Sequence, residues 1–558
     1  MFRALTHHLR THWRWFTAAL LAVAGLTALS LKLEENFPFS HFPMYGNPQP
    51  GDVDYYFLTD ASGEPLSTND YAGITAPQIK KRINKILKEE IKASGRKSKK
   101  IDLLSPELDA AALSVLIKMR EDASDASSRK LCIAWPAGVQ LKQGLIVTTP
   151  QGFRESFRTV ATLPDAGPPT LGVHVVSPPA DGNRIMLAMI GNYLMQYGVI
   201  VLIVLLILLA WKKLPPRLQE WLQANPGMFA IGRLEAWAWR AGLALIFWQV
   251  LQMNVNFDSL PHPQGLAHWE WWRPAILWLG IPENWNTVQL WSVPLLIWYV
   301  FGWANFLPLT ALTLVHILQR TLYASQGAPH HGHQLVSLVF CAQVVVAWGC
   351  FFWKCFRKRD RQKACPYPAS VHWTAMLVVV ATAYVITAFS KWEESNGKWL
   401  QNAQYFSNQI VKTHRQNYYN DLNPQYLVGS PPVAAPEPDP ANDRYRHPIP
   451  DQAHWMLTHS MLSRIFFGMG FLMEFSAFLL VFHRGIAALY GVAIIAFHLL
   501  VLWLMELTFP QNIEVVLVLC LNVPGWLIWW KFRRSQAASI PSPRDPVGND
   551  TPPGLPAA

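Results

Sequence analysis

Long apolar stretches that carry almost no charge recur along this sequence. Residues 197–211 (YGVIVLIVLLILLAW), for example, contain no charged side chain. An α-helix needs roughly 20 predominantly apolar residues to cross the hydrocarbon core of a bilayer. Several stretches approach that length, and tryptophan and tyrosine gather at their ends, as is typical of a membrane–water interface. We therefore predict about ten transmembrane helices, near residues 15–31, 186–211, 232–256, 287–303, 305–324, 333–353, 371–390, 457–481, 485–508 and 512–530.

Residues 33–185 follow a mixed pattern that is typical of a soluble domain. Residues 75–93 (TAPQIKKRINKILKEEIKA) carry isoleucine and leucine at helical spacing, which predicts an amphipathic helix, and residues 106–122 predict a second one. Residues 54–68 predict a strand, a glycine turn and a short strand, and residues 131–163 predict two or three more strands. The segment is therefore predicted to fold as a small α+β domain.

The predicted fold is an all-α polytopic membrane bundle with a small extracytoplasmic α+β domain inserted after the first span. The first span lacks a clear small-x-small cleavage site, which favours an uncleaved anchor over a signal peptide. The predicted segments are an N-terminal anchor (1–32), the α+β domain (33–185), a second transmembrane helix (186–211), a cytoplasmic linker (212–231), a transmembrane domain (232–531) with an external insert (391–456), and a disordered cytoplasmic tail (532–558). The Pro-rich residues 428–444 within the insert are expected to be extended or disordered.

The distribution of charge supports this topology. Charged residues make up 15% of the chain, apolar residues 51%, and the formal net charge is +11. A soluble protein carries about a quarter charged residues. The basic residues gather in short tracts between the apolar stretches, which argues against nucleic acid as a partner. In the predicted arrangement these tracts fall on the cytoplasmic side. We expect both termini in the cytoplasm and a bacterial inner membrane as the location.

Basic residues within 80–100 are the exception, because this stretch lies in the α+β domain. We interpret it as a solvated helix face, with a site for anionic lipid or a protein partner as the alternative. The six cysteines do not form a disulfide framework, since most of them fall in apolar stretches or in the basic loop predicted to be cytoplasmic.

No motif of a soluble enzyme is present in the sequence. It contains no P-loop, GxSxG, HExxH or CxxC pattern. The sequence HHGH at residues 330–333 superficially resembles a metal cluster. We interpret it as an interfacial loop between two spans, and we predict no metal site.

Several ionisable residues lie within or at the ends of predicted spans, where they are energetically costly in lipid. They are Lys391, Glu474, His498, His333 and Arg320. Each has an ordinary structural explanation: the lysine could snorkel to the interface, the histidines could be hydrogen-bonded core residues, and the acid could pair with an arginine such as Arg464.

In the predicted topology, three of these residues lie at a similar depth in the membrane. Lys391, His333 and His498 belong to its outer half, on three different spans. A lysine in an apolar cavity can become a usable base. We therefore predict Lys391, His333 and His498 as candidate catalytic residues, with Glu474 and Arg320 as supporting polar residues.

Residues 230–531 resemble the horizontally transferred transmembrane (HTTM) domain family, whose best-known members are the vitamin K-dependent γ-glutamyl carboxylases. The resemblance rests on residues 383–410 (AYVITAFSKWEESNGKWLQNAQYFSNQI), 330–340 (HHGHQLVSLVF) and 496–519 (AFHLLVLWLMELTFPQNIEVVLVL), and on the mid-span acid of FLMEFSAFLL. It is carried by the order and spacing of these motifs.

In the carboxylases a membrane lysine deprotonates vitamin K hydroquinone. The quinone then reacts with oxygen to give a strong base that removes a glutamate γ-proton. The resemblance implies that Lys391 is this lysine, that His333 and His498 donate hydrogen bonds to developing negative charge, and that a reduced quinone is the candidate cofactor. Two features differ: Ser390 stands where the carboxylases have a second lysine, and residues 33–185 show no carboxylase likeness. Protein carboxylation is therefore not the reaction we predict.

Two classes of function remain open from the sequence. The first is an enzyme that acts on a quinone or another lipid-soluble molecule at the extracytoplasmic face of the bilayer. The second is a non-catalytic transporter, or a scaffold whose extracytoplasmic domain binds a protein partner. A transporter should carry midplane polar residues and broken helices on paired spans. An enzyme should depend on Lys391, and a scaffold should not.

Overall fold

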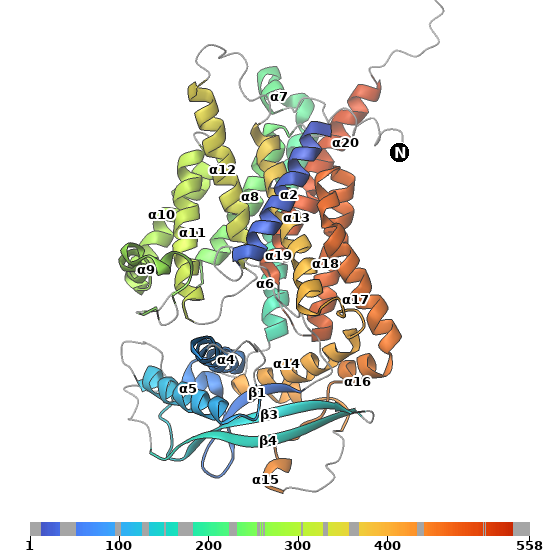
Figure 1. The fold of residues 1–558 in the computed structure, drawn as a ribbon. Helices are drawn as coiled ribbons and strands as arrows, with labels where there is room; N and C mark the ends of the chain where they lie inside the picture. The colour runs from blue at the N-terminus through green and yellow to red at the C-terminus, as the bar shows by residue number, and fades with distance from the viewer. Residues whose placement is uncertain are drawn as a thin grey trace, which may run out of the picture.

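The computed structural model describes residues 13–33, 52–94, 102–124, 133–149, 152–165, 182–222, 231–253, 257, 259–260, 263–302, 305–326, 333–356, 368–431, 440–505, 507 and 509–538. Within these ranges the chain forms a bundle of long helices with a small sheet domain across one end (Figure 1). Two regions discussed above lie outside the described residues: residues 330–332 of the HHGH motif, and the part of the predicted tail beyond residue 538.

Six helices in the described part of the chain are long and apolar enough to cross a membrane. The prediction of a helical integral membrane protein is therefore confirmed. The six are α6 (Gly182–Leu209), α12 (Gln334–Phe356), α13 (Pro368–Glu394), α17 with the 3-10 helix η8 (Ser460–Phe475 and Ser476–Val481), α18 (Arg484–Met505), and α19 with the π-helix η9 and α20 (Pro510–Val516, Leu517–Leu521 and Val523–Ala538).

Four other long helices lie alongside these six in the bundle (Figure 1). They are α2 (Trp13–Leu33), α8 (Arg233–Leu251), α10 (Pro282–Phe301) and α11 (Phe306–Ala324). None of the four is both long and apolar enough to be counted with the six; the apolar part of α2 covers only Phe16–Lys32, and α8 carries Glu235 and Arg240. They are therefore membrane-sized helices with a weaker apolar signal than the six.

Helix α13 lies near the centre of the bundle and is the most buried of the six apolar helices (Figure 1). Its sequence explains this position, because valine, alanine and threonine occupy nearly all sides of the helix between Val371 and Ala388. A helix that is apolar all round is expected to be buried by neighbouring helices. The end of α13 nearest the sheet domain carries Lys391.

The sheet domain contains one four-stranded antiparallel sheet in the order β2-β1-β3-β4. The strands are β1 (Val53–Thr59), β2 (Pro65–Leu66), β3 (Val139–Thr149) and β4 (Gly152–Leu163). Helices α3 (Thr68–Ala72), α4 (Ala76–Ala93) and α5 (Pro106–Ser124) belong to the same domain. The two helices predicted from the apolar spacing are thus present, and Ile79, Ile83 and Leu87 of α4 are buried in its core.

Both faces of the sheet are covered, because β1 is apolar on both sides. Tyr56 and Leu58 point into the core shared with α4 and α5, whereas Tyr55 and Phe57 point into a second core on the opposite face. This alternation is the two-residue period of a strand. The second core is closed by α14 (Phe406–Asp421) and α16 (Asp451–Thr458), which come from the segment between α13 and α17.

This segment corresponds to the predicted insert at 391–456. Its first four residues still belong to α13, and α14 is a well-formed helix that packs against β1. Ser430 pairs with Ile449 as an isolated β-bridge, and the Tyr445 hydroxyl donates to the Gly63 carbonyl at 2.6 Å. The aromatic side chains of this segment thus supply one layer of the sheet domain. Within the stretch 428–444 that was expected to be extended or disordered, Ser430 lies in this bridge and Pro440–Asp443 form the short helix α15. Residues 432–439 lie outside the described part.

An ion pair with almost no exposure joins this segment to the sheet. The Arg415 guanidinium on α14 donates to both carboxylate oxygens of Glu155 on β4, at 2.9 and 3.1 Å. It also donates to the carbonyl oxygens of Pro448 and His447, at 2.9 and 2.6 Å. All three guanidinium nitrogens donate, in four hydrogen bonds, which helps a buried charge to be tolerated. The pair fixes the sheet onto α14.

The remaining short elements connect the long ones. They are the 3-10 helices η2 (Trp211–Lys213), η3 (Gly265–His268), η4 (Glu270–Trp272), η6 (Ala403–Tyr405) and η7 (Pro424–Leu427), and the helices α7 (Pro216–Leu222), α9 (Arg273–Leu279) and α15 (Pro440–Asp443). The predicted linker at 212–231 thus contains helix α7. The predicted tail was expected to be disordered from residue 532, but α20 continues to Ala538.

Candidate functional site: a lysine–glutamate pair beneath the sheet domain

Lys391 forms an ion pair inside the bundle. It lies in the last turn of α13 and is only 7% exposed. Its Nζ donates to both carboxylate oxygens of Glu474 on α17, at 2.7 and 2.6 Å. The partner of Glu474 is thus Lys391 and not an arginine such as Arg464, which was the ordinary alternative for this acid. Arg464 instead donates to Gln404 at 3.5 Å on the exposed surface.

Burial explains why the lysine and the glutamate occur together. Either charge alone would be costly at membrane depth, and a paired charge is much less so. The ammonium group also lies 4.9 Å from the centre of the Trp399 ring, at a distance where a cation is attracted to the ring face. The pair is thus held between an aromatic wall and the core of the bundle.

A second polar pair lies close to the first. The hydroxyl of Tyr384 on α13 is 2.8 Å from Nε2 of His498 on α18, and both side chains are buried. The other ring nitrogen of His498, Nδ1, has no hydrogen-bond partner among the described residues. If Tyr384 donates to Nε2, Nδ1 carries the ring proton and is available as a donor.

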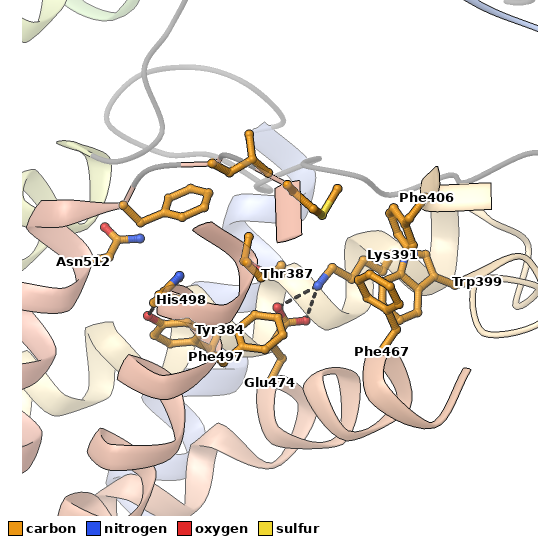
Figure 2. A pocket seen from close by; sticks show the side chains of 14 residues that line it. Tyr384, Thr387, Lys391, Trp399, Phe406, Phe467, Glu474, Phe497, His498 and Asn512 are labelled. Carbon is orange, nitrogen blue, oxygen red and sulfur yellow. Dashed lines mark hydrogen bonds and ion pairs between the residues drawn. The ribbon is translucent and has the colours of Figure 1, made fainter. Parts of the chain in front are cut away.

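The two pairs line one cavity of about 100 Å³ (Figure 2). Lys391, Trp399, Phe406 and Phe467 lie at one end of the view, and His498 and Asn512 lie at the other. Most of the wall is apolar, with few polar groups, which is typical of a small-molecule pocket. The lining residues are Tyr384, Thr387, Lys391, Trp399, Phe406, Phe467, Glu474, Phe497, His498, Val501, Met505, Leu507, Phe509 and Asn512.

Asn512 adds a third polar group at the His498 end. It lies in the first turns of α19, and its Oδ1 is buried without a hydrogen-bond partner among the described residues. Buried polar atoms in native proteins usually have partners, so each exception needs an explanation. Two such atoms, His498 Nδ1 and Asn512 Oδ1, belong to residues that line the same cavity. A ligand with a donor and an acceptor could satisfy both.

Part of the cavity wall is formed by residues in or next to the connections between helices. Trp399 belongs to the chain between α13 and α14, Phe406 is the first residue of α14, and Leu507 and Phe509 belong to the chain between α18 and α19. Phe406 also joins the hydrophobic core that contains Tyr55 and Phe57 of the sheet. One continuous core therefore links the sheet domain to the wall of the cavity.

His333 and Arg320 lie elsewhere in the bundle and do not line this cavity. The His333 carbonyl accepts a hydrogen bond from Ser337 Oγ at 3.0 Å, and the same Oγ is 2.9 Å from Nε2 of His316. Arg320 is buried on α11, where its Nη2 is 3.1 Å from the sulfur of Met253 and its guanidinium lies 5.0 Å from the centre of the Tyr323 ring. Of the three predicted catalytic residues, the structure brings only Lys391 and His498 together.

Tyr384, Trp399 and Asn512 were not singled out from the sequence. A signal for Tyr384 was nevertheless present, because it precedes Lys391 by seven residues, which is close to two helical turns. Thr387, four residues before Lys391, follows the same face. Trp399 comes from a chain connection, and Asn512 lies in the first turn of α19 directly after one, so no apolar periodicity predicts where either side chain lies.

No group of three or more histidine, cysteine, aspartate or glutamate residues that could hold a metal ion occurs within the described residues. His333 is described and buried, and it is the only residue of the HHGH motif inside the described ranges. The other three residues of the motif, His330, His331 and Gly332, therefore lie outside the described ranges.

A buried histidine and a half-buried lysine lie where α14 and the following chain meet the sheet domain. Burial, with a smaller contribution from the Arg415 charge, lowers the pKa of His447 to about 4. Burial also lowers the pKa of Lys412 to about 7, and the nearby Lys80 acts in the same direction while Asp54 opposes it. Folding therefore shifts both groups toward their neutral forms relative to the free side chains.

Comparison with known proteins adds no relative to these observations. The chain matches no family model, no curated protein and no solved structure.

Proposed function

We propose that this protein is a membrane enzyme that performs acid–base chemistry on a lipid-soluble small molecule in the Lys391 cavity. The observation that carries the proposal is the presence of two buried polar pairs, Lys391–Glu474 and Tyr384–His498, in one apolar cavity. Here His498 and Asn512 each keep one buried polar atom without a described partner.

The lysine–glutamate pair suits proton uptake from a weakly acidic substrate. As an ammonium–carboxylate pair it is electrically neutral. When it accepts a proton from a substrate hydroxyl, Glu474 becomes a carboxylic acid and the substrate anion becomes the counterion of the Lys391 ammonium. The cavity thus remains neutral overall, which matters in surroundings of low dielectric constant. His498 Nδ1 can donate a hydrogen bond to the developing oxyanion from the other end.

The substrate class follows from the lining and from the resemblance to the carboxylase-like family. Six of the fourteen lining residues are tyrosine, tryptophan or phenylalanine, which favours a flat apolar ligand with a polar edge. A reduced quinone has this form, and its hydroxyl is the proton donor that the mechanism requires. Protein carboxylation is not part of the proposal.

The topology we propose has ten spans, made of the six strongly apolar helices together with α2, α8, α10 and α11. These four lie alongside the six and have suitable lengths, 21, 19, 20 and 19 residues (Figure 1). Both termini would then be cytoplasmic, and the sheet domain and the Lys391 cavity would lie on the extracytoplasmic side of a bacterial inner membrane. The basic tracts favour this orientation.

Cys355 provides a direct test of orientation, because its side chain is exposed at the end of α12 away from the sheet domain (Figure 1). In a variant that keeps only this cysteine, a membrane-impermeant maleimide should react with inverted vesicles and not with intact cells from which the outer membrane has been removed. The control is a single cysteine at Ser62, on the β1–β2 turn. Reaction of Cys355 in the intact cells would reverse the proposed orientation.

The activity is tested with purified protein, vitamin K hydroquinone, oxygen and labelled bicarbonate, measuring quinone epoxidation and carbon fixation separately. We expect epoxide without carbon fixation into peptide. Lys391→Met/Glu474→Gln should abolish epoxide formation, because it removes the base without leaving an unpaired buried charge. The matched control is Lys398→Met, which changes an exposed lysine seven residues away.

Either of two results would overturn the enzymatic proposal. One is epoxide formation that persists in the double variant, because the base would then lie elsewhere. The other is that the native protein does not turn over the hydroquinone and that the tryptophan fluorescence of the protein does not change when the quinone is added. The scaffold alternative would then be preferred, because it requires neither Lys391 nor the cavity.

A further inference from the structure

A second cavity lies between α2, α12 and α13. Its volume is about 450 Å³, against about 100 Å³ for the Lys391 cavity. Helices α12 and α13 are both long and apolar enough to span a membrane, and the lining residues extend from Val371 to Ile386 along α13. The cavity therefore lies at the depth of the hydrocarbon core.

Small side chains on all three helices leave this space open. Ala22 on α2, Ala342 on α12, and Ala375 and Ala383 on α13 all face it. No described residue that lines the cavity carries a charge. The hydroxyl of Thr382 is already used, since it donates to the Val378 carbonyl at 2.7 Å. The other polar lining residues, Ser30, Cys341 and Thr374, are single groups among fourteen apolar ones, so most of the cavity offers a water molecule no polar partner.

The cavity opens toward the lipid-facing surface of the bundle. Val345, which lines it, is 71% exposed, and Leu21 and Leu29 on the adjoining α2 are 68% and 42% exposed. In a membrane these exposed apolar side chains contact lipid chains, so the opening is continuous with the bilayer. We infer that the cavity is a binding groove for one hydrocarbon chain of a membrane lipid.

This groove is distinct from the proposed active site. With 3.6 residues per helical turn, Tyr384, Thr387 and Lys391 lie on one face of α13. The groove residues Ala375, Val379 and Ile386 lie on the opposite face, and the two cavities share no lining residue. A lipid chain in the groove would therefore contact the back of the helix that carries the base, without entering the Lys391 cavity.

Photolabelling of the unmodified full-length protein tests the inference without any substitution. The protein is placed in nanodiscs of phosphatidylcholine that contain a small fraction of phosphatidylcholine with a diazirine in its acyl chain. After irradiation, labelled residues are identified by mass spectrometry. We expect several-fold more label on groove residues such as Val345 and Val379 than on Leu202 of α6, which is 52% exposed but lies outside any described cavity. Equal labelling at all exposed apolar positions would mean ordinary annular contact and would overturn the inference, as would an unlabelled groove.

A matched pair of substitutions on α2 gives an independent readout. Ala22 and Ala24 are both exposed, but only Ala22 lines the groove. Ala22→Trp should fill it and reduce the label on Val379 several-fold, whereas Ala24→Trp should leave that label unchanged. In both variants, the amount of label on Leu202 should equal that in the native protein, which shows that the bundle is folded and in contact with lipid. Equal effects of the two substitutions would contradict a specific groove. Because neither experiment measures catalysis, both outcomes are independent of the proposed enzymatic function.

Discussion

Lys391 and Glu474, which are 83 residues apart in the sequence, form a pair whose Nζ–carboxylate distances are 2.7 and 2.6 Å. The pair joins the end of α13 to the middle of the span that contains α17. Each residue on its own has an ordinary explanation, an interfacial lysine or a mid-span acid. Together they form a neutral unit that can take up a proton and remain next to a substrate anion without adding net charge to the bundle.

The stability of this pair can be measured by a double-mutant cycle. Lys391→Met leaves the Glu474 carboxylate buried without its cation, and Glu474→Gln leaves the Lys391 ammonium without its anion. Each single change should lower the free energy of unfolding by about 3–5 kcal/mol, the usual cost of removing one partner of a buried pair. The double variant should recover most of that loss. Reversible unfolding in mixed micelles measures all four proteins, and additive single effects would show that the residues are not coupled.

Much of the candidate site could be predicted from the cost of charge in a membrane. Lys391, Glu474 and His498 stand out in apolar stretches because such residues are rare there. The residues that these side chains contact could not be predicted from the cost of charge in a membrane. Glu474 lies on a span with Arg464 ten residues earlier, and nothing in the sequence indicates that Lys391 comes closer. That choice depends on how α13 and α17 pack, which is set by many apolar contacts.

The fold shows the same division between local and long-range information. The helical membrane bundle and the helices α4 and α5 follow from apolar spacing, which is local. The contribution of α14 and α16 to the sheet domain is not local, because these helices cover strands that lie over 240 residues earlier in the chain. A related hint was available: β1 (VDYYFLT) is apolar at consecutive positions, which is expected when both faces of a strand are buried.

The Arg415–Glu155 pair should determine how firmly the sheet domain is attached to α14. Arg415→Met would leave the nearly inaccessible Glu155 carboxylate without a cation, at a cost of about 3–5 kcal/mol. Hydrogen exchange of β4 amides should then accelerate. The matched control is Arg444→Met, which removes an exposed pair with Glu64 that is worth about 0–1 kcal/mol. Unchanged exchange in Arg415→Met would show that the apolar core alone attaches the sheet.

Gly144 on β3 is required because the Tyr55 ring on β1 lies directly over it. The two residues are register partners, and a Cβ at position 144 would overlap the ring. Gly144→Ala should therefore destabilise the sheet domain by about 1–3 kcal/mol, the usual cost of overpacking. Gly191→Ala on α6 is the control, because a Cβ there meets no atom within 4 Å. Thermal unfolding followed by circular dichroism compares them, and equal midpoints would show that Tyr55 can move aside.

Acid should loosen the contact between α14 and the sheet domain through His447. The folded protein lowers the pKa of His447 to about 4 from the ordinary value of 6.5, so the unfolded chain binds more protons between these two values. Stability therefore falls as pH decreases from about 6.5 to 4, by up to about 3 kcal/mol for this group. Limited proteolysis of the sheet domain across this range measures the effect. His447→Gln should flatten the dependence of stability on pH. An unchanged slope in that variant would assign the pH dependence to other groups such as Asp54. Burial raises the pKa of Asp54, but Lys80 outweighs this effect, so the pKa is lowered in the folded protein.

Tyr384 is expected to act as a positioning residue for His498. Its hydroxyl is 2.8 Å from Nε2, so Tyr384→Phe removes the group that sets the tautomer and leaves the cavity nearly unchanged in volume. The change in stability should be small, about 0.5–1.5 kcal/mol. If Nδ1 donates to the substrate oxyanion, turnover of the hydroquinone should fall by roughly ten-fold, equivalent to about 1.4 kcal/mol of transition-state stabilisation. Nitrogen NMR of labelled histidine should show the tautomer change directly.

The control for this prediction is Tyr490→Phe, which removes a hydroxyl that donates to Ser476, away from the cavity. It should change neither turnover nor the His498 spectrum. A Tyr384→Phe protein with native turnover and an altered His498 spectrum would show that the tautomer does not matter for the chemistry. His498 would then be a core residue, and Lys391 and Glu474 alone would carry the proposed proton transfer.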